Sequence, residues 1–330
     1  MPSRRRALII LALLLGVSAA SLLLSLTAGS IHVPPRQVFA AFVGAGEGGT
    51  SAEVVIHLRL PRALAGFACG GLLALSGALL QVLLRNPLAD PYILGISGGA
   101  GVGAILSILF GLGVAGIAGA SFAGALAAML LVFGLAHGDG SWTQTRLLLT
   151  GVIVAAGCGA LVALILSISP DDKLHGMLFW IMGDLSQAMH PELALAALAA
   201  VLLAAMPFAR ELNLLSRGPD TALSLGVRIG ALRRGVYFAA SLATAAAVAQ
   251  AGSIGFVGLI VPHLVRLAAG NDQRLLLPAS MLAGGSLLVV ADTAARTLIA
   301  PQQLPVGVLT ALIGVPVFLF LLARDARRRR

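Results

Sequence analysis

Long apolar runs separated by short polar stretches recur from one end of the chain to the other. Ten such runs cover residues 7–28, 60–84, 92–110, 112–136, 146–169, 191–209, 233–253, 256–268, 275–298 and 305–323. All but the eighth are close to or above the roughly 20 residues that a helix needs to cross a bilayer core of about 30 Å. Only 11% of the residues are charged, whereas soluble domains carry roughly 25%. The sequence therefore predicts an all-α polytopic membrane protein, folded as a bundle of ten transmembrane helices.

The eighth run, residues 256–268, is too short to cross a bilayer by itself and contains Pro262. Short or broken helices are tolerated at membrane depth only where protein or a cavity surrounds them. Gly255 and Gly258 at its start would let neighbouring helices approach closely. We therefore expect a short helix enclosed by the rest of the bundle.

Basic residues set the expected orientation. With ten spans and the N-terminus inside, only five of the 22 lysines and arginines fall outside the cytoplasm, namely Arg36, Arg59, Arg62, Lys173 and Arg296. Nine spans would put the arginine cluster at residues 327–330 outside, against the positive-inside bias. Both termini are therefore predicted to be cytoplasmic. The first apolar run is longer than the about 15 residues of a cleaved signal peptide, so we interpret it as a retained span.

Small residues recur every fourth position in several runs. Two examples are the series Gly66, Gly70, Ala74, Ala78 and the series Gly151, Ala155, Gly159, Ala163. Such series let helix backbones approach closely in lipid, where packing contributes much of the association energy. They predict a compact bundle and give no information about function.

Several kinds of chemistry have no sequence support. There is no phosphate-binding loop of the G-x-x-x-x-G-K-[ST] type, and Lys173 is the single lysine. No zinc-binding pattern occurs, and Cys69 and Cys158 lie within apolar runs, as buried free thiols would. The net charge is +9, but the basic residues are not interleaved with aromatic residues, which argues against a nucleic-acid partner. Asp292 is the clearest carboxylate within a span, so a proton relay is not indicated. Energy for any transport is expected to come from another chain, and no cofactor is expected on this one.

The connection at residues 210–234, here called the coupling segment, is too long for a simple turn between two spans. Pro219 suits the first turn of a helix, and Asp220 adds negative charge near that N-terminus. Ala222, Leu223, Leu225 and Val227 are expected to form a short apolar surface on the cytoplasmic face. Two interpretations are open, a helix lying among the lipid headgroups or a docking surface for a soluble partner.

Four long strings make the sequence resemble the iron-chelate and vitamin B12 permeases of ABC importers, the FecCD-type family. They are RLPRALAGFACGGLLALSGALLQVLLRNPLADPYILGISGGAGVGA from Arg59, LNLLSRGPDTALSLGV from Leu212, GSIGFVGLIVPHLVRLAAGNDQRLLLPASMLAGGSLLVVADTAAR from Gly252 and LPVGVLTALIGVPVFLFLL from Leu304. They occur in the family's order and span essentially the whole chain. The resemblance therefore implies one transmembrane permease domain over residues 1–330.

The resemblance also implies an assembly and an activity. Members of the family are homodimers of ten-helix subunits with a translocation path along the two-fold axis, in the bacterial inner membrane. Two copies of a separate ATPase carry ATP and Mg²⁺, and a periplasmic binding protein delivers the cargo. The chain itself is then no enzyme, and it moves a metal chelate inward by alternating access. Haem and ferric siderophores rank ahead of cobalamin on family frequency alone.

Residue roles carry over from the family motifs. Arg59, Arg62 and Arg296 match arginines that dock the binding protein, although they could instead pair with Asp292 or cap helix ends. Gate positions at the cytoplasmic mouth match Asn86, Leu88, Thr143, Gln144 and Thr145, where an ordinary turn and helix cap is the competing interpretation. Contacts to the ATPase match Leu214, Ser216, Asp220, Ala222, Leu223, Leu225 and Gly226.

Three other classes of protein would show different features. An ion-coupled secondary carrier for a large amphipathic solute would show ion coupling and commonly inverted repeats. An intramembrane enzyme would need paired buried carboxylates or a histidine cluster. A membrane scaffold would move no cargo.

Overall fold

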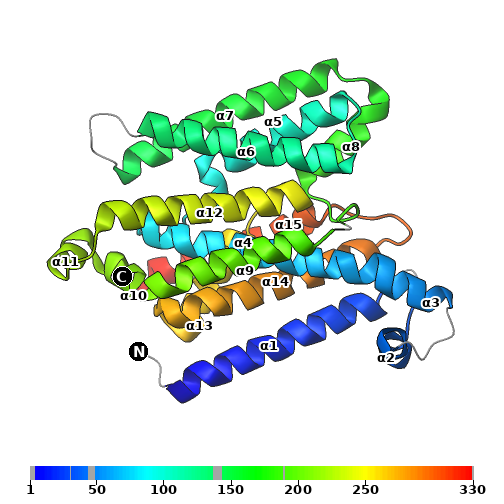
Figure 1. The fold of residues 1–330 in the computed structure, drawn as a ribbon, viewed down its shortest axis with the longest axis horizontal. Coiled ribbons are helices and arrows are strands. Elements are labelled where there is room, and N and C mark those ends of the chain that lie inside the picture. The colour runs from blue at the N-terminus through cyan, green and yellow to red at the C-terminus, as the bar shows by residue number, and fades with distance from the viewer. Residues whose placement is uncertain (1–3, 30, 44–48, 137–142, 189, 329–330) are drawn as a thin grey trace.

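A computed structural model describes residues 4–29, 31–43, 49–136, 143–188 and 190–328, and within these ranges all regular structure is helical (Figure 1). The helices are α1 (Arg4–Thr27), α2 (Pro35–Val43), α3 (Thr50–Glu53), the π-helical η1 (Val54–Arg59), α4 (Leu60–Leu83), the 3-10 helix η2 (Pro91–Leu94), α5 (Ile96–Leu109), α6 (Val114–Ala136), α7 (Gln144–Ile168), α8 (Asp171–Met182), α9 (Glu192–Ala205), the 3-10 helix η4 (Met206–Phe208), α10 (Ala209–Arg217), α11 (Pro219–Ser224), α12 (Ile229–Ala251), α13 (Val257–Ala269), α14 (Gln273–Thr297) and α15 (Val306–Arg328). The predicted all-α class is confirmed.

Each of the ten predicted runs contains a helix of 13 or more residues, although these helices differ in their capacity to cross a membrane. Within the described residues, six helical segments are long and apolar enough by length and composition, and they contain α1, α4, α6, α7, α9 and α14. The apolar helices α5, α13 and the first part of α15 are shorter. Helix α12 is long enough, but Arg233, Arg234 and Gln250 make it less apolar. The chain is thus a multi-pass membrane protein, and the count of ten spans stays a prediction.

Helix α4 lies at the centre of the bundle, with α9, α12, α13 and α14 packed around it (Figure 1). Its glycines bring backbones into direct contact. A Cβ added at Gly70 would lie 2.2 Å from the Gly284 carbonyl oxygen, and one added at Gly77 would lie 1.8 Å from the Gly258 oxygen. The series of small residues in this run therefore marks real helix–helix contacts.

The eighth run forms α13, a helix of 13 residues that contains Pro262 and is largely buried, as expected. Gly258 makes the predicted close approach, because an added Cβ would lie 2.8 Å from the Leu73 carbonyl oxygen. Gly255 does not, since nothing lies within 4 Å of its added Cβ. The part of the expectation that concerned Gly255 is wrong, because this residue precedes the helix rather than lying on its packed face.

Helix α8 forms in a stretch where the sequence indicated no span. Pro170 precedes it, and Asp171 and Asp172 occupy its first turn, where negative charge is favourable with the helix dipole. Lys173 donates a 2.6 Å hydrogen bond to the Leu109 carbonyl oxygen at the end of α5. Twelve residues are too few to produce a clear membrane-span signal, so only the packed structure reveals this helix.

The two ends of the bundle differ in what they carry. The start of α1 lies at one end of the bundle, together with α10 and α11. Helices α2, α3 and α8 lie at the other end (Figure 1). The first end is here called the inner end and the second the outer end, following the orientation predicted from the basic residues.

Candidate functional site

Charged side chains of α4 and α14 meet at the outer end. Arg62 forms a bidentate ion pair with Asp292, in which Nη2 donates to Oδ1 at 2.7 Å and Nε donates to Oδ2 at 2.9 Å. Asp292 is buried, and Arg296 lies one helical turn further along with its Nε 4.0 Å from Oδ2. Arg296 also donates to the carbonyl oxygen and hydroxyl of Ser25. Together with Arg59, these groups form what we call the outer cluster (Arg59, Arg62, Asp292 and Arg296).

Arg59 caps the end of α1. Its Nη1 donates to the carbonyl oxygens of Leu26 at 2.7 Å and Thr27 at 3.1 Å, and its Nη2 donates to that of Ile31. Carbonyl groups at a helix C-terminus lack partners within the helix, so a buried guanidinium there satisfies several of them at once. Arg59 is only 6% exposed and lies at the end of the π-helical turn η1, just before α4.

The three arginines predicted to dock a binding protein are therefore brought together, and each has partners within its own chain. These internal contacts are the ones that the alternative interpretation expected, namely pairing with Asp292 and capping of a helix end. Arg62 is the member with an outward-facing contact, since its Nη1 donates to the exposed Gln303 side chain at 3.1 Å. Their docking role stays a prediction.

The predicted gate residues lie at the inner end, where α4 ends and α7 begins. Gln144 Nε2 donates to the Leu83 carbonyl oxygen at 3.0 Å and so joins the two helices. Thr143 caps α7 by accepting from the Arg146 N–H at 3.3 Å. The Leu88 N–H donates to Asn86 Oδ1 at 2.9 Å within a turn. The structure brings the two parts of the gate together, and their role in gating stays a prediction.

A partly buried polar junction joins η2 and the start of α5 to the residues before α13. Tyr92 in η2 exchanges hydrogen bonds with Ile254, donating to its carbonyl oxygen at 2.9 Å and accepting from its N–H at 2.8 Å. Ser97 pairs with Ser253 at 2.9 Å. Burial raises the pKa of the Asp90 carboxyl to about 6, although the hydrogen bond from the Tyr92 N–H opposes this rise. The junction holds the start of α5 against the residues before α13, and it was not predicted from the sequence.

The coupling segment folds as α10 and α11 joined at Gly218. Gly218 has a φ of 132° and Gly226 a φ of 79°, a backbone region that favours glycine. Pro219 is the first residue of α11 and Asp220 lies in its first turn, as predicted. Leu214 is half-buried and Ser216 is exposed.

The apolar surface of this segment is narrower than expected. Leu223 and Leu225 are 59% and 61% exposed, whereas Ala222 and Val227 are buried. Successive residues of a helix point about 100° apart, so Ala222 faces inward while Leu223 faces outward. The Val227 N–H donates to the Ala222 carbonyl oxygen at 3.0 Å, which folds the chain back on itself. The expectation that all four side chains share one exposed surface is wrong.

Asn213 fastens the coupling segment to α14. Its Nδ2 donates to Asp272 Oδ1 and its Oδ1 accepts from the Gln273 N–H, both at 2.9 Å. Asp272 is also the N-cap of α14, because its side chain accepts from the Arg274 N–H at 3.1 Å. This contact was not predicted from the sequence. The available signal was an Asp immediately before a long apolar run, which is typical of an N-cap.

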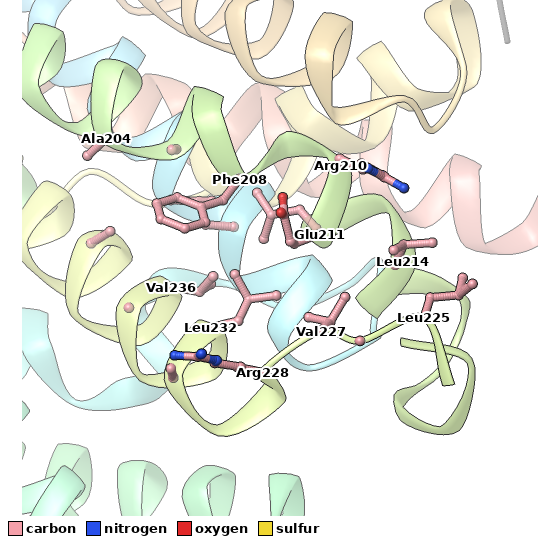
Figure 2. Close-up of a pocket in the computed structure, with 17 residues that line it drawn as sticks. Ala204, Phe208, Arg210, Glu211, Leu214, Leu225, Val227, Arg228, Leu232 and Val236 are labelled. Atoms are coloured by element: carbon pink, nitrogen blue, oxygen red, sulfur yellow. The ribbon is translucent and has the colours of Figure 1, made fainter. Parts of the chain in front are cut away.

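A cavity of about 580 Å³ lies between α9, α10 and α12 at the inner end (Figure 2). Its lining is mostly apolar and consists of Leu79, Ala204, Ala205, Phe208, Arg210, Glu211, Leu212, Leu214, Leu225, Gly226, Val227, Arg228, Ala231, Leu232, Gly235, Val236 and Ala239. Among the described residues, no group of three or more His, Cys, Asp or Glu could hold a metal ion. Cys69 is a buried free thiol and Cys158 a half-buried one.

Comparison with known proteins gives consistent matches over nearly the full chain. Residues 12–324 match the model of the FecCD transport family. The hemin transport system permease protein of Yersinia pestis is 41% identical over 84% of this chain and 85% of its own length. The vitamin B12 import system permease protein of Klebsiella pneumoniae is 39% identical over 98% of this chain and 95% of its own. A solved structure of a metal-chelate type ABC transporter in an inward-facing conformation aligns with a TM-score of 0.83 and 33% identity, covering 96% of this chain and 99% of that one.

Proposed function

This chain belongs to the FecCD transport family, and on that premise we propose that it carries a metal chelate from the periplasm to the cytoplasm by alternating access. The family consists of permease subunits of ABC transporters, which are non-catalytic membrane components. The observation that carries the proposal is the match over nearly the whole length to permeases named for hemin and for vitamin B12. Both cargoes are large metal chelates, and we rank haem or a ferric siderophore ahead of cobalamin.

The proposed assembly contains two copies of this chain, two copies of an ATPase that binds ATP and Mg²⁺, and a periplasmic binding protein, in the bacterial inner membrane. The exposed apolar faces of α7 and α15 support the proposal that a second protein chain packs against them within the membrane. Ile153 and Ile168 of α7 are 70% and 69% exposed, and Leu312 of α15 is 66% exposed. A second copy of the chain would cover part of these faces and form the path between them.

The proposed energy transfer runs through the coupling segment. ATP closes the two ATPases, and that motion reaches the helices through α10 and α11. Asn213 supports this route because it joins α10 directly to the start of α14, whose other end carries Asp292 and Arg296 of the outer cluster. ATP shifts the equilibrium between inward-facing and outward-facing states only to the extent that it binds one state more tightly.

Reconstituted transport tests the proposal as a whole. Proteoliposomes containing the permease, its ATPase and its binding protein are expected to accumulate haem, a ferric siderophore or cobalamin only when ATP and Mg²⁺ are present. Replacing ATP by a non-hydrolysable analogue removes accumulation. Uptake driven by an ion gradient without the ATPase would instead establish the secondary carrier.

Docking of the binding protein can be tested without disturbing the internal ion pair. Gln303→Glu places a carboxylate beside the outward-facing Nη1 of Arg62, where it competes with glutamates of the binding protein. We expect binding-protein affinity to fall roughly tenfold, equivalent to about 1.4 kcal/mol. Gln302→Glu adds the same charge one residue away, on another exposed side chain, and serves as the control. Equal affinities for the two variants would assign the outer cluster a structural role only.

Contact with the ATPase is tested at the two exposed leucines of the coupling segment. Single cysteines at Leu223 and Leu225 are expected to crosslink to cysteines on the ATPase in membranes. A cysteine at Leu193, which is 80% exposed near the start of α9 at the outer end, is the control and is expected not to crosslink. Labelling of position 223 from the periplasmic side would overturn the predicted orientation.

A further inference from the structure

The cavity between α9 and α12 extends deep along the helices from the inner end. Its deepest lining residue on α12, Ala239, is ten residues from the start of that helix, which corresponds to about 15 Å. Leu79 of α4 is buried and forms part of its lining. Ala204 and Gly235 are exposed small residues from its two facing walls, and no atom lies within 4 Å of a Cβ added at Gly235. The cavity is therefore a narrow cleft with apolar walls that is open at its side.

The charged residues that line the cleft all belong to the coupling segment and lie at its inner end. Figure 2 shows the Glu211 carboxylate beside Phe208, the Arg228 side chain below Leu232, and Arg210 pointing the opposite way. Glu211 Oε2 is buried and accepts no hydrogen bond from any described residue. Leaving a buried carboxylate oxygen without a donor is costly, so a bound cationic group with N–H donors would be favourable at Glu211.

A ligand that completes the cleft needs three chemical parts. An ammonium group, with its three donors, suits Glu211. A phosphate suits the exposed Arg228, which forms no ion pair within the described part of the chain. An apolar chain suits the deep walls. A side chain of a soluble partner can reach the charged rim but not Ala239, because about 15 Å of helix separates that residue from the rim.

We propose that this cleft binds a phospholipid with a primary ammonium headgroup, of the phosphatidylethanolamine class. One acyl chain lies between α9 and α12, the ammonium group contacts Glu211, and the phosphate contacts Arg228. The cleft opens where basic residues of the coupling segment face the inner leaflet, so the lipid enters from the side. This inference goes beyond the transport function and does not depend on the identity of the cargo.

Lipid retention provides the test. The full permease–ATPase complex is reconstituted in nanodiscs of equimolar phosphatidylethanolamine, phosphatidylglycerol and phosphatidylcholine, then released, and its retained lipids are counted by native mass spectrometry. The natural sequence is expected to retain phosphatidylethanolamine preferentially. Glu211→Gln removes the carboxylate, so the preference for phosphatidylethanolamine over phosphatidylglycerol should disappear. Gly235→Leu fills the cleft, and retention of every lipid there should be lost.

Two further variants keep the result interpretable. Arg217→Gln removes a positive charge from the same segment outside the cleft and should leave retention unchanged. Ala231→Leu, at an exposed wall position, repeats the filling test if Gly235→Leu fails to assemble. Unchanged preference in Glu211→Gln, or no lipid preference in the natural sequence, overturns the proposal. Crosslinking of a cysteine at Gly235 to the ATPase, without retained lipid, would assign the cleft to that partner and also overturn it. The assay needs neither cargo nor ATP, so its failure is separable from a failure of the transport proposal.

Discussion

Helices α4 and α7 are nearly equal in length and apolar character, yet they occupy opposite environments. They have 24 and 25 residues, and both carry a small residue at every fourth position. In the most apolar part of the segment containing α4, 89% of the residues are buried, against 17% for α7. Similar helices thus serve as the core of the bundle in one case and as an exposed wall in the other.

The difference lies in what meets the small residues. Gly70 and Gly77 of α4 face backbone carbonyl groups of α14 and α13. In α7 only the inner part of the series is used, because Gly151 faces the Ile93 carbonyl oxygen while nothing lies within 4 Å of a Cβ added at Gly159. A series of small residues therefore indicates where close packing is feasible, and the neighbours decide whether it occurs within one chain.

The largest expected contrast comes from adding bulk to the two helices. Gly77→Leu would force side-chain atoms against the Gly258 carbonyl oxygen, which lies 1.8 Å from an added Cβ. We expect almost no monodisperse permease after extraction, as judged by size-exclusion chromatography. Gly159→Leu in α7 has open space around the added Cβ and points away from the face that carries Ile153 and Ile168, so it should assemble with a near-normal yield. Similar yields for both variants would contradict the assignment of α4 as the core.

A second contrast concerns charge at the outer end of α4. Asp292→Leu removes the buried carboxylate that pairs with the partly buried Arg62, and breaking such a pair typically costs about 3–5 kcal/mol. Glu53→Leu removes an exposed pair with His57, for which the expected cost is below about 1 kcal/mol. Unfolding of the purified protein in mixed micelles measures both. If the double variant Arg62→Met with Asp292→Leu is no more stable than Asp292→Leu alone, the unpaired charge is not the cause.

The smallest expected contrast is between the buried hydroxyl group of Ser76 and the exposed hydroxyl group of Ser167. Ser76 in α4 donates to the Ala240 carbonyl oxygen at 2.7 Å and pairs with Thr244, joining α4 to α12. Ser167 in α7 donates only to Leu164 of its own helix. Interhelical hydrogen bonds in membranes contribute about 0.6–2 kcal/mol, so Ser76→Ala should be measurably less stable than Ser167→Ala in the same unfolding assay. No difference would mean that packing alone joins α4 to α12.

Much of the fold could be predicted from the sequence, because span length and charge placement obey strong local constraints. A run of about 20 apolar residues has to span or be enclosed, and every backbone polar group within lipid has to be paired in the helix itself. These rules located a helix in each of the ten runs, including the short enclosed α13 with Pro262. The preference of proline for the first turn of a helix placed Pro219 correctly at the start of α11.

Other features depended on which elements meet, and no local pattern shows that. Nothing around Arg59 indicates that a π-helical turn directs it onto the end of α1, 32 residues earlier in the sequence. The contact between Asn213 and Asp272 joins residues 59 positions apart. Ala222 became buried and Gly255 stayed open because burial is set by neighbouring helices rather than by residue type.

The sequence by itself determined that this chain is a multi-pass helical permease of the FecCD family, because the length of its apolar runs and the order of its motifs are properties of the linear chain. Only the tertiary structure decided that α4 is the core, that the outer arginines are held by Ser25, Asp292 and the end of α1, and that an apolar cleft ends at the unpaired Glu211 oxygen. The physical reason is that the ten runs are all apolar and helical. Hydropathy then no longer distinguishes inside from outside, and close packing between particular backbones makes that choice instead.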